Sequence, residues 1–152
     1  MAPHAGAPPP RLLRTAQEEK RTYLCNALLN SATGTCEEDE ITVLLPLVEA
    51  LSLRHFVVLD DLLAHCDPPV SYLRPEDLKL WTVWARIGGR FPGGDDGKYM
   101  YQSIVADLEG RGLIKRSFGA YDLQEDRPLY PSLQAKKLLR FVRSPVPDTS
   151  ES

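Results

Sequence analysis

The stretch KYMYQSIVADLEGRGLIKRSFGAYDLQEDRPLYPSLQAKKLLR, residues 98–140, decides the fold of this chain. It begins with large apolar residues at helical spacing and stops at Gly110-Arg111-Gly112. Two short apolar segments, 113–114 and 129–130, then flank a segment rich in glycine and acidic residues. A last helix opens at Ser132, so the pattern predicts a β-hairpin between two helices. The helical apolar set is Tyr101, Ile104, Val105 and Leu108.

This order of parts resembles the end of bacterial winged helix-turn-helix regulators. In those proteins a helix ends in L-x-x-x-G-L-I, as residues 108–114 do here. A wing then returns through an arginine, here Arg127, and a closing helix follows a Ser or Thr, here Ser132. The resemblance covers about a quarter of the chain. It implies a winged-helix fold and, less specifically, DNA binding.

A broader resemblance is to the Abi-alpha type of bacterial protein, which is linked to abortive phage infection. The helix YLCNALLNSA at 23–32 precedes an acidic turn and a Leu-rich helix pair at 41–63, and a winged-helix-like end follows. The similar order of parts extends over most of residues 18–142. It implies a role related to phage defence and carries over no catalytic residues.

The first half of the chain reads as helices. Thr15 to Glu18 forms a capping box that opens a helix to about Ala32, and Thr35 to Glu38 forms a second one with an acidic first turn. We expect Pro46 to kink or divide this second helix, and Ser52 to cap a third. The predicted fold class is mainly α with a small β-hairpin: a helical N-terminal half followed by a winged-helix-like half.

Between the halves, Pro75 occupies a first helical position, and one helix is predicted from there to about Arg86. Residues 88–97 form a glycine-rich segment, which predicts a loop. We expect Asp95 or Asp96 to cap the next helix, which runs from about Gly97 to Glu109.

The ends of the chain differ in composition from its centre. Residues 1–14 are rich in Pro and Ala, which predicts a flexible lead-in, and residues 144–152 have the composition of a disordered tail. Residues 15–143 are predicted to form a single domain.

The 152 residues contain no apolar run near the ~20 residues of a membrane-spanning helix, and the first ten residues lack the apolar centre of a signal peptide. The three cysteines form no CxxC pair, which favours free thiols in a reducing compartment. We therefore expect a cytoplasmic protein.

The net charge of −3 is unevenly distributed. Residues 1–96 have a net charge of −5, whereas residues 97–143 have +4. Such an asymmetry is typical of a nucleic-acid-binding face, although a charge of this size also suits a solvated surface.

The helix from Gly97 to Glu109 is the candidate recognition helix, because its polar side offers groups that contact phosphates and base edges. The hairpin adds basic residues that we predict to contact phosphates. Asp107 and Glu109 on the helix, and an acidic wing at 122–126, oppose DNA binding because they repel phosphates. The candidate nucleic-acid-binding residues are Lys98, Tyr99, Gln102, Ser103, Lys115, Arg116 and Arg127.

The sequence contains no complete catalytic or metal-binding motif. His65 and Cys66 are adjacent, so on a helix they diverge by about 100° and make a poor zinc pair. The acidic run at 37–40 lacks the spacing of a calcium loop, and the Gly97-Lys98 pair lacks the remaining residues of a phosphate-binding loop. We expect no enzyme, no cofactor and no metal.

Two hypotheses remain open. The first is a DNA-binding regulator that uses the recognition helix and the wing. The second is a protein-interaction or assembly module, either a homodimer or bound to a partner through the N-terminal helices. The second is favoured by the acidic wing and by the two tryptophans at positions 81 and 84.

Overall fold

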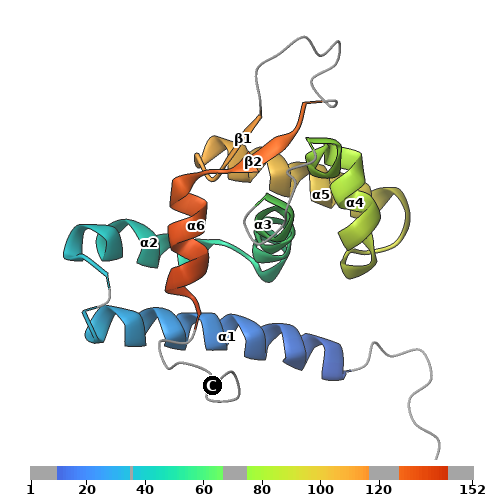
Figure 1. Ribbon diagram of the computed structural model, residues 1–152. Helices are drawn as coiled ribbons and strands as arrows, with labels where there is room; N and C mark the ends of the chain where they lie inside the picture. The colour runs from blue at the N-terminus through green and yellow to red at the C-terminus, as the bar shows by residue number, and fades with distance from the viewer. Residues whose placement is uncertain (1–9, 35, 67–74, 117–126, 144–152) are drawn as a thin grey trace, which may run out of the picture. The chain divides into compact units, whose positions relative to one another are not determined.

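The computed structural model describes residues 10–34, 36–66, 75–116 and 127–143 (Figure 1). These residues form six α-helices, two short 3-10 helices and a two-stranded antiparallel sheet. The prediction of a mainly α fold with a small β-hairpin is confirmed. The chain divides into two compact units, and the single domain predicted for residues 15–143 stays a prediction. The units comprise residues 1–49 with 141–152, and residues 50–140.

The first unit contains α1 (Pro10–Ala32) and α2 (Glu38–Ala50). Helix α1 begins at Pro10 rather than at Thr15, because proline is tolerated in the first turn, where no backbone donor is needed. The capping box expected at Thr15 therefore lies inside the helix. Helix α2 has the expected acidic first turn, and Pro46 does not divide it.

The second unit opens with α3 (Leu53–Cys66), whose first turn follows Ser52 as predicted. The single helix predicted from Pro75 to Arg86 is wrong. A short 3-10 helix, η1 (Pro75–Leu78), is separated from α4 (Leu80–Ile87) by Lys79, whose backbone is extended at φ −70° and ψ 149°. A second 3-10 turn, η2 (Gly88–Arg90), follows α4.

Helix α5 (Gly94–Gly110) begins before the predicted Gly97, so Asp95 and Asp96 lie in its first turn and do not cap it. Gly93 is the N-cap residue, so no side chain caps the start of this helix. At the other end, Gly112 has φ 75°, and the Leu113 N–H donates to the Leu108 carbonyl at 2.9 Å. This left-handed turn ends the helix and leads directly into the hairpin.

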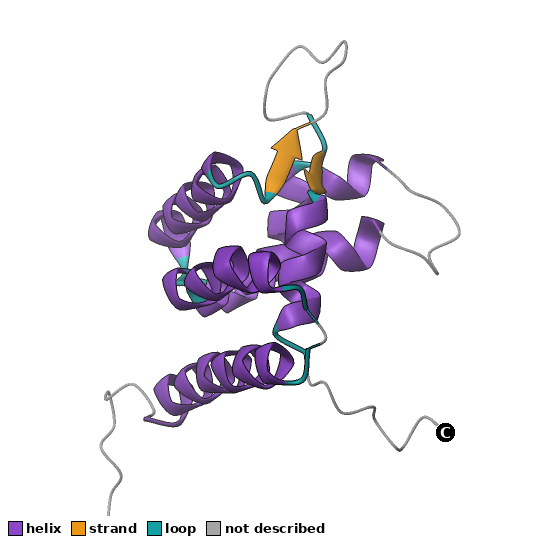
Figure 2. Ribbon diagram, turned by 90° about the vertical axis from the view of Figure 1, so that its left-hand side faces the viewer, coloured by secondary structure: helices purple, strands orange, loops and turns teal. Residues whose placement is uncertain are grey.

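The hairpin pairs β1 (Ile114–Arg116) with β2 (Leu129–Pro131) (Figure 2). Lys115 lies opposite Tyr130. Helix α6 (Leu133–Phe141) follows, and the predicted opening at Ser132 is confirmed, because Ser132 Oγ accepts the Ala135 N–H at 3.2 Å. The predicted wing tip lies outside the described residues, as do residues 1–9 of the predicted lead-in and all of the predicted tail.

One apolar core joins the elements of the second unit. Helix α3 contacts α4, α5 and β2, and β1 contacts α5. Because both the hairpin and α3 hold α5, its buried face is fixed and its opposite face is presented to solvent. The largest fully buried side chains of this unit are Tyr101, Phe56, Leu51, Leu59, Leu62, Leu78, Leu108, Leu113, Ile114 and Leu129.

Candidate binding surface

The outer face of α5 carries the first four candidate residues. Tyr101, Ile104 and Val105 are buried on one face of α5, so the polar residues on the opposite face are exposed to solvent. All four of these candidate residues are exposed, and Tyr99 is 76% exposed. The exposed candidates on α5 are Lys98, Tyr99, Gln102 and Ser103.

Acidic side chains dominate the charge of the same helix. Asp95 and Asp96 are exposed in its first turn, and Lys98 is its one basic residue, against four Asp and Glu residues. In helix-turn-helix complexes the start of the recognition helix enters the major groove. Two carboxylates at this end repel phosphates, so the helix is poorly suited to DNA at the position where contact is closest.

The candidate residues of the hairpin differ in whether their side chains are free to bind a phosphate or already bind a carboxylate. Lys115 is exposed, whereas the Arg116 guanidinium forms a forked pair with Glu109. Arg116 Nε lies 3.0 Å from both Glu109 carboxylate oxygens, and Nη2 lies 2.8 Å from Oε1. A phosphate contact by Arg116 would have to compete with this half-buried carboxylate.

Arg127, the last candidate, lies at the start of the returning segment of the hairpin. Its Nε is buried and has no hydrogen-bond partner among the described residues. The candidate residues thus fall into an exposed group on α5 and Lys115, and two arginines that are partly withdrawn from solvent.

A polar chain joins the start of α3 to the last part of α5. The backbone N–H of Ser52 donates to His55 Nδ1 at 3.2 Å, so this ring nitrogen is an acceptor and Nε2 carries the proton. Nε2 then donates to Asp107 Oδ2 at 3.0 Å. Partial burial opposes ionisation of Asp107, but hydrogen bonds from Arg111 and His55 hold the pKa of its carboxyl below the usual range.

This polar network contains Ser52, His55 and Asp107. The sequence analysis did not connect them, because 52 residues separate His55 from Asp107. Ser52 Oγ lies 2.7 Å from Nδ1, the ring nitrogen that faces the aspartate in serine hydrolases. Ser52 and His55 also stand at the N-cap and third positions of α3, where a side chain that accepts the N-cap backbone N–H stabilises a helix start. The geometry therefore fits helix capping and a link to α5.

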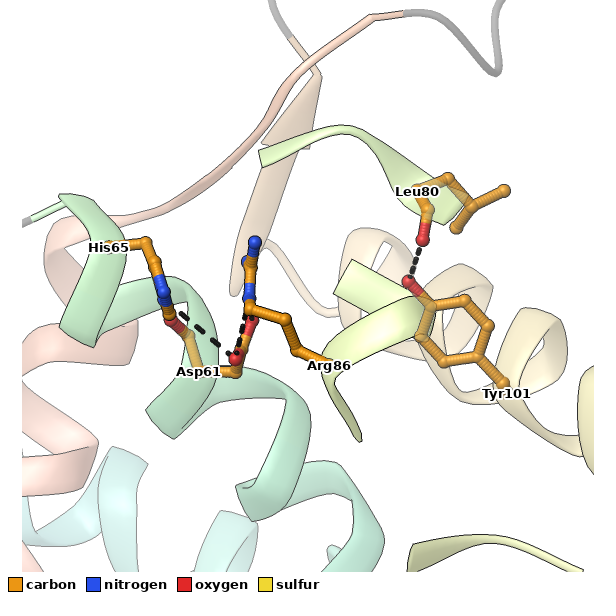
Figure 3. A network of polar contacts seen from close by, with 5 residues as sticks. All are labelled: Asp61, His65, Leu80, Arg86 and Tyr101. Atoms are coloured by element: carbon orange, nitrogen blue, oxygen red, sulfur yellow. Dashed lines mark hydrogen bonds and ion pairs between the residues drawn. The ribbon is translucent and has the colours of Figure 1, made fainter. Parts of the chain in front are cut away.

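A second polar network joins α3 to α4 through Asp61, Arg86 and His65 (Figure 3). The Arg86 guanidinium binds Asp61 through Nε at 3.0 Å and Nη2 at 2.7 Å, and the Asp61 side chain is 10% exposed. His65 Nδ1 lies 3.8 Å from the same carboxylate. Asp61 therefore links α3 to α4.

The Tyr101 hydroxyl donates to the Leu80 carbonyl (Figure 3). Burial raises the pKa of Tyr101 well above its ordinary value. Trp84, Phe91 and Tyr101 form a cluster with ring centroids 5.1–5.8 Å apart, and Trp81 lies 6.1 Å from Tyr101 at its edge. Trp84 is half-buried and Trp81 is 37% exposed, so the two tryptophans back α5 and extend towards the surface.

The described residues contain no group of three or more His, Cys, Asp or Glu side chains placed to hold a metal ion. All three cysteines are described and form no disulfide. Within the same residues no single helix is long and apolar enough to cross a membrane, although the bent pair of α2 and α3 passes on length and composition alone.

Comparison with protein-family models, with curated proteins and with solved structures found no match for this chain.

Proposed function

We propose that residues 50–140 form a non-enzymatic, winged-helix-like binding module whose outer α5 face binds a protein partner. The order of three helices and a hairpin supports the winged-helix interpretation. The observation that carries the choice of a protein partner is the pairing of Arg116 with Glu109, because this carboxylate already binds the Arg116 guanidinium that a phosphate would need.

The chemistry of the α5 face also favours a protein. Tyr99 is the most exposed large apolar or aromatic side chain among the described residues, and aromatic side chains are enriched where proteins bind one another. Asp95 and Asp96 stand within one turn of it. A partner surface with an apolar pocket bordered by lysine or arginine would fit this arrangement.

Double-stranded DNA is the second candidate, favoured by the exposed Lys98, Gln102, Ser103 and Lys115. These residue types contact phosphates and base edges. A regulatory role belongs to this DNA-binding candidate, whereas a link to phage defence belongs to the protein-binding module, and both rest on the resemblances of the sequence alone. The cytoplasmic location likewise stays a prediction.

Fluorescence anisotropy with labelled random duplex DNA separates the two candidates. For a protein-binding module we expect no DNA affinity that falls with salt between about 50 and about 200 mM, because few phosphates are contacted. A loss of affinity of about tenfold or more over this range would overturn the choice of a protein partner. The DNA candidate would be supported further if Glu109→Gln, which removes the carboxylate that binds Arg116, strengthened DNA binding.

The α5 face itself is tested by comparing Tyr99→Ser with Leu133→Ser in co-purification from cells. Both side chains are highly exposed, at 76% and 68%, so the two substitutions remove similar apolar surface. A partner that is lost with Tyr99→Ser and kept with Leu133→Ser supports the proposed face. Equal retention by both variants excludes it.

A further inference from the structure

We draw no further inference here: the strongest candidate, the exposed face of α1 around Leu28 and Leu29, carries none, because nothing in the part of the chain that the structure describes shows what covers it.

Discussion

The side chain of Asn30 on α1 holds the end of α6: its Nδ2 donates to the Phe141 carbonyl at 2.7 Å and to the Arg143 carbonyl at 3.0 Å. Asn26, one turn earlier, donates to the Val142 carbonyl at 2.9 Å. The last carbonyls of a helix have no partner within it, so two asparagines from the far end of the chain satisfy them. Asn30 is only 5% exposed, which makes these bonds difficult for water to replace.

Asn30→Leu should therefore destabilise the protein by about 2–3 kcal/mol, because it leaves two carbonyls without a donor in a buried site. Asn26→Leu is the matched control. Its amide is half-buried and makes one such bond, so we expect a loss of about 1 kcal/mol. Urea unfolding followed by circular dichroism measures both free energies of unfolding. The reverse order of the two losses would contradict this account.

Gly97 lies where α5 passes Pro92. A Cβ at position 97 would be 1.8 Å from the Pro92 carbonyl oxygen, so the backbone must move to accept any side chain. We expect Gly97→Ala to cost more than about 2 kcal/mol, which thermal unfolding will detect. Gly110→Ala on the same helix meets no atom within 4 Å and should be neutral or slightly stabilising. Similar melting temperatures for the two variants would show that the contact with Pro92 is not tight.

The link between His55 and Asp107 predicts a specific pH dependence. The depressed pKa of Asp107 means that its contribution to stability is present above the ordinary aspartate pKa of about 3.9 and is lost as the pH falls through the folded-state pKa. Wild type should therefore be more stable than Asp107→Asn near pH 6, and this difference should shrink below about pH 4. Urea unfolding at a series of pH values measures it. A difference that grows as the pH falls would have the wrong sign.

Tyr101 should resist ionisation in alkaline solution. Its pKa is raised by burial, so the stability that the neutral phenol contributes is present below about pH 10 and is lost as the pH rises towards the folded-state pKa. In a spectrophotometric titration, Tyr101→Phe should leave the tyrosines that ionise near pH 10 unchanged in number. The same variant should lose about 1 kcal/mol of stability with its hydrogen bond to Leu80. A loss of one tyrosine from the pH 10 transition would show that Tyr101 is accessible to solvent.

Local pattern accounts for most of the elements. The periodic apolar residues of 101–108, the stop at Gly112 and the Ser132 cap each act within a few residues, so their outcomes were predictable. Two predictions about where helices begin and end were wrong. Helix α1 begins earlier than predicted, with a proline in its first turn. The extended backbone of Lys79 interrupts the helix predicted from Pro75. A local sequence pattern shows where a helix can begin or end, but packing decides which backbone conformation is adopted there.

The sequence by itself determined which residues lie on each face of α5, because helical spacing separates Tyr101 and Val105 from Tyr99 and Gln102. Only the tertiary structure decided which charges remain available. Glu109 occupies Arg116 and Asp107 binds His55 because the fold brings these side chains within 3.0 Å. A linear pattern records the charges of a surface, but their pairing depends on distances between segments, which only the packed chain defines.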